Sequence, residues 1–255
     1  MRNFEQNGVL LVGVDVFLLS HITAENDGEY GLFPVRSSNG VITNCVADGH
    51  EDTGIYVGLS ENITVQNSTA SRNVNGIEVE NSSHIQVTGN ETFDNTAGIL
   101  VVLLPGLSIK TASDIVLTNN SVHDNNRPNL AQDGFEQAVP TGSGILIVGT
   151  DETTVQSNGV TGNDFVGIGV ANTGLLADLT GVPIDDIEPF PDGVRVLNNE
   201  VTGNGGAQPI PTLPPGVDLL WDGTGSSCWS GNGFETSLNL DLLGGAPSSA
   251  LPACL

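Results

Sequence analysis

The chain has 255 residues, of which 30 are acidic and six are basic, so its formal net charge is −24. A field of that sign repels phosphate backbones and anionic headgroups, which excludes nucleic acid as a partner. No stretch approaches the ~20 apolar residues of a membrane span, so we expect no membrane insertion. Aromatic residues make up 5% and 33 residues are glycine, which favours short strands and tight turns around an aliphatic core.

Both ends of the chain bear on its location. The first 17 residues lack the ordered regions of a signal peptide and lead almost directly into a repeat, with no capping segment. We expect an export signal to be absent from this chain, and N-terminal coils could be absent as well.

Cys228 and Cys254 bracket the C-terminal tail, where a disulfide would pin a segment prone to fray. Cys45 is expected to be a small buried hydrophobe. A disulfide implies an oxidising compartment, so the predicted location is extracellular or periplasmic.

The stretch from Gly54 to Asn75 is repeated almost position for position by the next 22 residues. Each copy begins with glycine and an alternating apolar run, GIYVG or GIEVE, and continues through a polar turn into I-x-V and Asn- and Thr-rich turns. Period-two alternation is typical of half-buried strands. The initiating glycines are 22 or 23 residues apart except at two longer gaps, and they are Gly8, Gly31, Gly54, Gly76, Gly98, Gly144, Gly167 and, approximately, Gly216.

A polar position follows the second strand of each repeat by three residues. Its occupants are Ser68, Asn90, Asn120, Asn158 and Asn199, with Cys45 at the same place in an earlier repeat. Side-chain amides stacked at one per coil can bond to one another and to turn carbonyls that would otherwise lack partners. We interpret these residues as a structural ladder and exclude them from the candidate site.

Three short strands per repeat, apolar stacks and an asparagine ladder resemble the right-handed parallel β-helix repeat family, which includes pectate-lyase-like and NosD-type periplasmic proteins. The resemblance covers residues 8 to 225 and implies an all-β, single-stranded right-handed parallel β-helix of about eight coils. We expect the solenoid over residues 1–225, with loop insertions, and an irregular, disulfide-closed cap over 226–255. The resemblance also implies an extracellular or periplasmic protein that acts on or binds carbohydrate.

The longer gaps contain insertions on both sides of the first-strand sheet, within 103–113 and 125–143 and then within 172–193 and 205–216. Insertions in a repeat array usually build the functional face, and here they would form two walls beside a flat floor. The alternative is that they only cover the sheet. Outward-facing aliphatic residues support that alternative for 125–143, which we expect to pack on Leu100, Val102, Leu146 and Val148.

A polar cluster is expected on the floor of this groove. Neighbouring strands lie ~4.8 Å apart, which would place Tyr56 beside Glu78, with Arg36 one or two rungs away. His50 and Asp52 occupy the turn before the Tyr56 strand. A uronate lyase or epimerase needs a base, an acid and a cation that neutralises the carboxylate, so the predicted catalytic residues are Arg36, His50, Asp52, Tyr56 and Glu78. The predicted substrate-binding residues are Phe33, Glu80, Asn81 and Lys110.

Metal binding has one candidate set. Asp185, Asp186 and Glu188 crowd one insertion and could bind Ca²⁺, although their spacing matches no established calcium motif. The alternative is that no cofactor is needed. The four histidines are scattered, without the spacing of a zinc or copper site.

Two functions remain open at this point. The first is a carbohydrate-active β-helix, either a polysaccharide lyase or uronate epimerase or, through paired carboxylates, a glycoside hydrolase. The second is a non-catalytic β-helix that binds a polysaccharide or cell-surface glycan, or belongs to a surface or filament assembly. The sequence leaves the oligomeric state open.

Overall fold

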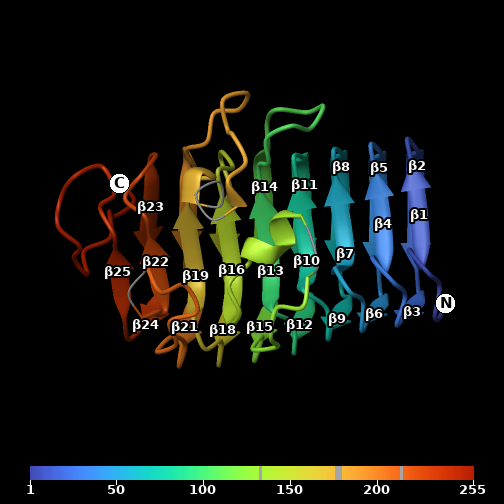
Figure 1. The fold of residues 1–255 in the computed structure, drawn as a ribbon, viewed down its shortest axis with the longest axis horizontal. Coiled ribbons are helices and arrows are strands. Elements are labelled where there is room, and N and C mark those ends of the chain that lie inside the picture. Colours follow the sequence, from blue (N-terminus) through green and yellow to red (C-terminus); the bar gives the residue numbers. More distant parts are fainter. Residues whose placement is uncertain (132–133, 176–179, 213–214) are drawn as a thin grey trace.

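The computed structural model describes residues 1–131, 134–175, 180–212 and 215–255. Successive strands enter three different parallel sheets in turn, so each strand pairs with the third strand before and after it along the chain (Figure 1). This is a parallel β-helix, in which each coil contributes one strand to every sheet. The two ends of the chain lie at opposite ends of the solenoid (Figure 1).

The strands of each sheet stack in chain order along the solenoid. The first sheet contains β1 (Val9–Val12), β4 (Leu32–Val35), β7 (Thr53–Gly58), β10 (Asn75–Glu80), β13 (Ala97–Val102), β16 (Ser143–Val148), β19 (Val166–Ala171), β22 (Leu219–Trp221) and β25 (Ser237–Asn239). The second contains β2 (Asp15–Ser20), β5 (Ser38–Thr43), β8 (Glu61–Gln66), β11 (Ser83–Thr88), β14 (Ser113–Thr118), β17 (Thr154–Gln156), β20 (Val194–Leu197) and β23 (Ser227–Ser230). The third contains β3 (Thr23–Glu25), β6 (Val46–Asp48), β9 (Thr69–Ser71), β12 (Glu91–Phe93), β15 (Ser121–His123), β18 (Gly159–Thr161), β21 (Glu200–Thr202) and β24 (Gly233–Phe234).

The core consists of aliphatic side chains stacked in register. In the first sheet Ile55 pairs with Ile77, Ile77 with Ile99 and Ile99 with Ile145, and all four are fully buried. Each such side chain contributes roughly 1.5–3 kcal/mol by leaving water. Because one residue type recurs at one rung per coil, the sequence period itself specifies the register.

The predicted asparagine ladder is confirmed. The amide nitrogen of Asn90 donates to Asn120 Oδ1 at 3.1 Å, and that of Asn120 donates to Asn158 Oδ1 at 2.9 Å. A second ladder, which the sequence analysis did not identify, runs along the turn before the first sheet. Its amides lie five residues after those of the first, at Asn73, Asn95, Asn125, Asn163 and Asn204. That constant offset was the available signal.

The insertion at 125–143 packs on the first sheet as expected. It carries the short 3-10 helix η1 (Phe135–Ala138), which lies over β13 and its neighbours (Figure 1). Val139 and Phe135 form an apolar cluster with Leu100, Val102 and Val148 outside the main core. This half of the sheet is therefore a covered surface and not an open floor.

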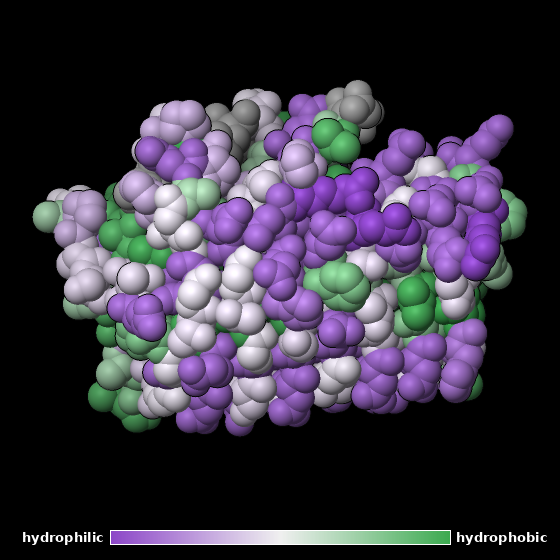
Figure 2. Space-filling model, turned by 90° about the horizontal axis from the view of Figure 1, so that it is seen from below, coloured by the Kyte–Doolittle hydropathy of each residue, from purple (hydrophilic) through white to green (hydrophobic). Residues whose placement is uncertain are grey.

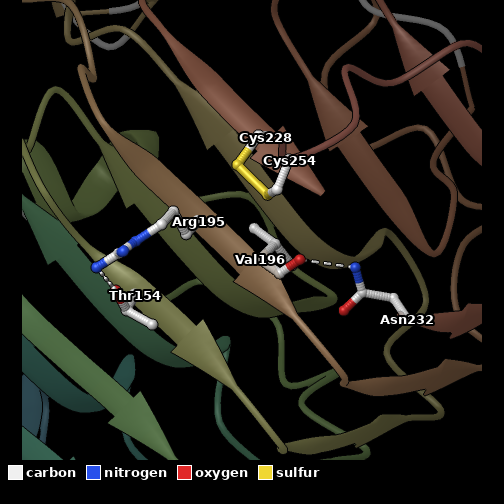
Figure 3. Close-up of a disulfide and its surroundings, with 6 residues drawn as sticks. All are labelled: Thr154, Arg195, Val196, Cys228, Asn232 and Cys254. Carbon is white, nitrogen blue, oxygen red and sulfur yellow. Dashed lines mark hydrogen bonds between the residues drawn. A yellow bond between two sulfur atoms is a disulfide. The ribbon is translucent and has the colours of Figure 1, made fainter. Parts of the chain in front are cut away.

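The solenoid extends beyond residue 225, which corrects the expected boundary of the cap. Strands β23, β24 and β25 each continue one of the three sheets, so the irregular segment is residues 240–255. The predicted disulfide joins Cys228 on β23 to Cys254 (Figure 3). Cys45 is a free, buried thiol, as expected. Trp229 lies 6% exposed at this end of the core and contacts Trp221, with ring centroids 5.5 Å apart.

The surface is dominated by polar side chains. Seen from the side of the third sheet, it is mostly hydrophilic, with apolar patches near the two ends of the solenoid (Figure 2). The exposed apolar residues of the first coil include Leu10, Val12 and Leu18 of β1 and β2. Within the described part of the chain, no helix has the length and apolar content needed to cross a bilayer.

Candidate functional site

A cavity of about 820 Å³ borders the N-terminal ends of β7 and β10. One wall is formed by the turns that lead from the third sheet into the first, which contribute Tyr30 and Asp52. The opposite wall is the insertion between β15 and β16, which contributes Arg127 and Glu136. We refer to this space as the acidic cavity. One wall of the acidic cavity is thus built from the repeating turns, and the other wall is built from a single irregular insertion.

Three carboxyl groups meet beside this cavity. Oxygen atoms of Asp52, Glu78 and Glu136 all lie within 4.8 Å of one another. Thr53 Oγ1 donates to Glu78 Oε2 at 2.6 Å and also lies 3.1 Å from Asp52 Oδ1, while Asn75 Nδ2 donates to Glu78 Oε2 at 3.0 Å. A hydroxyl has one proton, so Thr53 donates to only one carboxyl at a time and can accept from the other when that one is protonated.

Burial and mutual repulsion favour the protonated forms of these acids. Burial raises the pKa of Asp52 to about 7, with a further contribution from the charge of Glu136, while hydrogen bonds from Tyr30 and Thr53 oppose the shift. Burial also raises the pKa of Glu78 well above its usual value, followed by the charges of Glu136 and Asp52. At neutral pH the cluster therefore retains at least one proton and can both give and take one.

Tyr56 lies beside Glu78 in register, as predicted, but it is buried. Its hydroxyl donates to Glu80 Oε1 at 2.6 Å, and burial raises the pKa of Tyr56, so the phenol stays protonated. The rings of Tyr30 and Phe33 cover it, with centroids 5.2 and 4.7 Å from that of Tyr56. Tyr30 and Phe33 are themselves half-buried and present the accessible aromatic surface. Tyr56 and Glu80 thus support this surface from below.

The structure places His50, a predicted catalytic residue, in the scaffold of the turns. It occupies the second ladder one coil before Asn73. Its backbone N–H donates to Asn73 Oδ1 at 2.9 Å, and its ring Nδ1 accepts from the backbone N–H of Asp27 at 3.2 Å. Burial lowers the pKa of His50, so the ring is neutral. With 3% of its surface exposed, it reaches the cavity wall only at an edge.

The remaining predicted groups lie at the other end of the same strands. Arg36 follows β4 and borders a separate groove, so the structure does not bring it to Asp52. Asn81 is fully buried, and its amide donates to the carbonyls of Leu104 and Ile109, so it anchors the 103–113 insertion. Lys110 forms an ion pair with Asp186 and joins two insertions.

The predicted calcium set is divided. Asp186 accepts from Lys110 and from the backbone of Gly106, while Glu188 belongs to a different group with Asp151 and Asp192. Carboxylate oxygens are the ligands that Ca²⁺ prefers, so both three-acid groups, the one at Asp52 and the one at Asp151, have suitable donors. Asp185 joins neither group among the described residues.

Three members of the cavity were missed from the sequence. Tyr30 directly precedes a repeat glycine, a position that the alternation pattern treats as a turn. Arg127 and Glu136 belong to the insertion that we expected only to cover the apolar strip. The charge of these two side chains, in an insertion that also supplies apolar residues to the sheet surface, was the available signal.

Residues 1–105 match a family model described as a right handed beta helix region. No functionally curated protein matches the chain. Among solved structures, it is similar to a double mutant of the periplasmic alginate epimerase AlgG, at 18% identity and a TM-score of 0.68, over 89% of this chain and 47% of that one. It is also similar to an alginate lyase from Paenibacillus sp. str. FPU-7, at 14% identity and 0.55 over 86% and 68%, and to pectate lyase Pel9A, at 15% and 0.53 over 87% and 54%.

The chain therefore spans about half the length of the alginate epimerase that it matches. At these identities the likeness establishes the fold, which is the right-handed parallel β-helix. The resemblance inferred from the repeats is confirmed.

Proposed function

We propose that this protein acts on a uronate-containing polysaccharide by proton transfer in the acidic cavity, outside the cell or in the periplasm. The observation that carries the proposal is that Asp52, whose pKa burial raises to about 7, shares the cavity with Arg127. Among the described residues, the Arg127 guanidinium has neither an ion pair nor a hydrogen bond. The alginate- and pectate-acting names of the structural neighbours support the same substrate class.

Removal of the proton next to a uronate carboxylate requires that this carboxylate be neutralised. Arg127 supplies a planar donor suited to bidentate carboxylate binding. Asp52 is close to half ionised at neutral pH, which suits a general base, and it would take the proton from the sugar carbon. Burial and then the charge of Glu136 keep the pKa of Asp52 near neutrality.

Tyr30 is placed to complete the cycle. It is hydrogen-bonded to Asp52, and burial raises its pKa, so it holds its proton at neutral pH. In an elimination, the bond to the glycosidic oxygen breaks and that oxygen takes the Tyr30 proton. Asp52 then returns its newly acquired proton to Tyr30 through the same hydrogen bond, which restores both groups without a co-reactant.

Replacement of Asp52 tests the proposal. Asp52→Asn should lower turnover of uronic-acid polysaccharides by about 100-fold or more, because it removes the base while preserving shape. Unsaturated products would be followed by ultraviolet absorbance and C5 inversion by NMR. Glu91→Gln, at an exposed acid on β12 of the third sheet, is the matched control and should retain wild-type rates. A fully active Asp52→Asn variant would refute the mechanism.

One observation favours a second candidate, non-catalytic glycan binding. Tyr56, Glu78 and Glu80 are each less than a tenth exposed, so the predicted floor is closed in this structure. Under that alternative, the wild-type protein and Asp52→Asn bind glycans alike and neither turns over any substrate. Hydrolysis by paired carboxylates would instead release reducing ends without unsaturation, also from neutral polysaccharides.

A further inference from the structure

Arg36 is the second arginine whose guanidinium has no partner among the described residues. The chain has six basic side chains, and the others of the described structure, apart from Arg127, are engaged. These contacts are Arg2 with Glu25, Arg72 with Asp48, Lys110 with Asp186, and Arg195 with Thr154. In a chain with net charge −24, two arginine side chains without an ion pair or hydrogen bond among the described residues mark where the fold can accept an anion.

Arg36 lines a groove of about 570 Å³ at the C-terminal ends of β4, β7 and β10. The 103–113 insertion forms its far wall, which is held in place by buried Asn81. Hydroxyl groups of Ser38, Ser83 and Thr111 also line it. We call this the Arg36 groove. It is polar, supported by a fixed loop, and separate from the acidic cavity.

The backbone at Arg36 adds an independent observation. Its φ is 52°, in the left-handed region, at a turn position that other coils fill with Gly13, Asn81 and Gly149. Arginine is disfavoured there relative to glycine or asparagine. Leu59 shares this conformation, but its side chain is buried and its packing accounts for it. The residue Arg36 is exposed, so burial of its side chain does not account for the unfavourable backbone.

We propose that the Arg36 groove is a second anion subsite, which binds the carboxylate of a distant sugar unit in the same uronate chain whose reacting unit occupies the acidic cavity. The occupant rests on the proposed function. Strand β7 has six residues, which separates the two sites by ~20 Å at ~3.3 Å per residue. Half-buried Phe33 and Tyr30 lie along this path and offer faces on which sugar rings stack. The glycan therefore crosses the solenoid axis, parallel to the strands.

Glu61 also lines the groove and is exposed. Its carboxylate accepts hydrogen bonds from sugar hydroxyls but repels an anionic unit bound to Arg36. Removing its charge and removing that of Arg36 should therefore change affinity in opposite directions. Substitutions at Arg36 and Glu61 therefore form a pair within one groove, with opposite expected effects on affinity for the uronate chain.

Binding of uronic-acid oligosaccharides of increasing length to the Asp52→Asn protein, by isothermal titration calorimetry, tests the subsite. Adding Arg36→Gln should weaken the binding of the longest oligosaccharides by about 10-fold or more and reduce the salt dependence of their affinity. The affinity for a disaccharide should not change. Glu61→Gln should bind long chains as tightly as the parent or tighter. Arg195→Gln, on the second sheet, and neutral oligosaccharides should show no difference.

The outcomes separate this inference from the proposed function. Equal binding of long uronates by the parent and Arg36→Gln, or no binding by either, overturns the subsite. A length-dependent loss in Arg36→Gln supports it, even if Asp52→Asn keeps full activity and the proposed reaction fails. An equal loss at every length would also overturn it, because Arg36 would then act on the first sugar unit or on the fold.

Discussion

Asp52 and Glu78 are acids that the fold holds away from water. Glu78 is 1% exposed, and the hydroxyl of Thr53 and the amide of Asn75 supply hydrogen bonds that water no longer provides. Such a group normally destabilises a fold when ionised, so its retention inside the sheet surface is costly. The same burial brings the pKa of Asp52 to about 7, where it is useful in proton transfer. Stability and proposed chemistry therefore depend on the same carboxyls.

This burial predicts a pH dependence of stability. An acid whose pKa rises on folding stabilises the protein below its unfolded pKa of about 4, and that contribution is lost as pH rises through the folded value of about 7 for Asp52. We expect the free energy of unfolding to fall between pH 5 and pH 8, on the order of a few kcal/mol. Denaturant titrations at both values measure it.

Asp52→Asn should be less sensitive over this range, because it removes one of the titrating acids. The control Glu91→Gln should follow the wild-type profile. The lowered pKa of buried His50 acts in the opposite sense, and its contribution is lost as pH falls below about 6.5. Parallel profiles for wild type and Asp52→Asn would show that Asp52 is not shifted.

At the scale of the element, the two amide ladders fix the turns between sheets. Asn95 accepts from both the backbone and the amide of Asn73, and its own amide donates to the carbonyl of Ala70 and to Asn125. Each ladder side chain therefore hydrogen-bonds to buried polar groups in the coil before it and in the coil after it. Arg127 and Glu136 are carried on the insertion that follows the Asn125 rung, so the ladder also positions one wall of the acidic cavity.

Removal of one ladder side chain should therefore destabilise the fold. Asn95→Ala leaves several buried donors and acceptors without partners, and we expect it to lower the free energy of unfolding by about 3 kcal/mol. Gln86→Ala, an exposed side chain in the same coil, should change it by less than about 0.5 kcal/mol. Chemical denaturation compares the two. A loss of similar size in both variants would mean that the ladder adds nothing specific.

At the scale of the whole molecule, the C-terminal end is closed by a tail that returns to the last coil. The backbone of Trp229 donates to Pro252 O at 2.8 Å and accepts from Cys254 N at 3.3 Å, and the disulfide ties Cys254 to β23 (Figure 3). The tail thus covers strand edge and core together. At the N-terminal end, the backbone of Met1 and Asn3 pairs with Glu25 of β3, while Leu10 and Leu18 are exposed.

The disulfide should matter mainly for this end. Cys254→Ser opens a loop of 26 residues' separation, and we expect a loss on the order of 3 kcal/mol in unfolding free energy. Limited proteolysis should then cut within residues 240–255. Reducing agent should bring the wild type to the level of the variant and leave the variant unchanged. Resistance of the tail in Cys254→Ser would show that backbone pairing alone holds it.

The sequence by itself determined the parts of this protein that repeat. The 22–23-residue period, the apolar pairs and the Asn90 to Asn199 ladder required a parallel β-helix, because each coil presents the same chemistry to the next. The Cys228–Cys254 pairing followed from its position at the end of the chain.

Only the tertiary structure decided which groups meet in the site. His50 looked like a turn residue beside Asp52, yet the stack turns it inward as a ladder rung. Arg36 and Asp52 belong to adjacent coils but lie at opposite ends of their strands. Arg127 and Glu136 reach the cavity from an insertion without a period, whose path depends on packing against Leu100 and Val148. The repeated sequence specifies the strand register from one coil to the next. The path of an insertion without a repeat is instead set by its contacts with residues far away in the sequence.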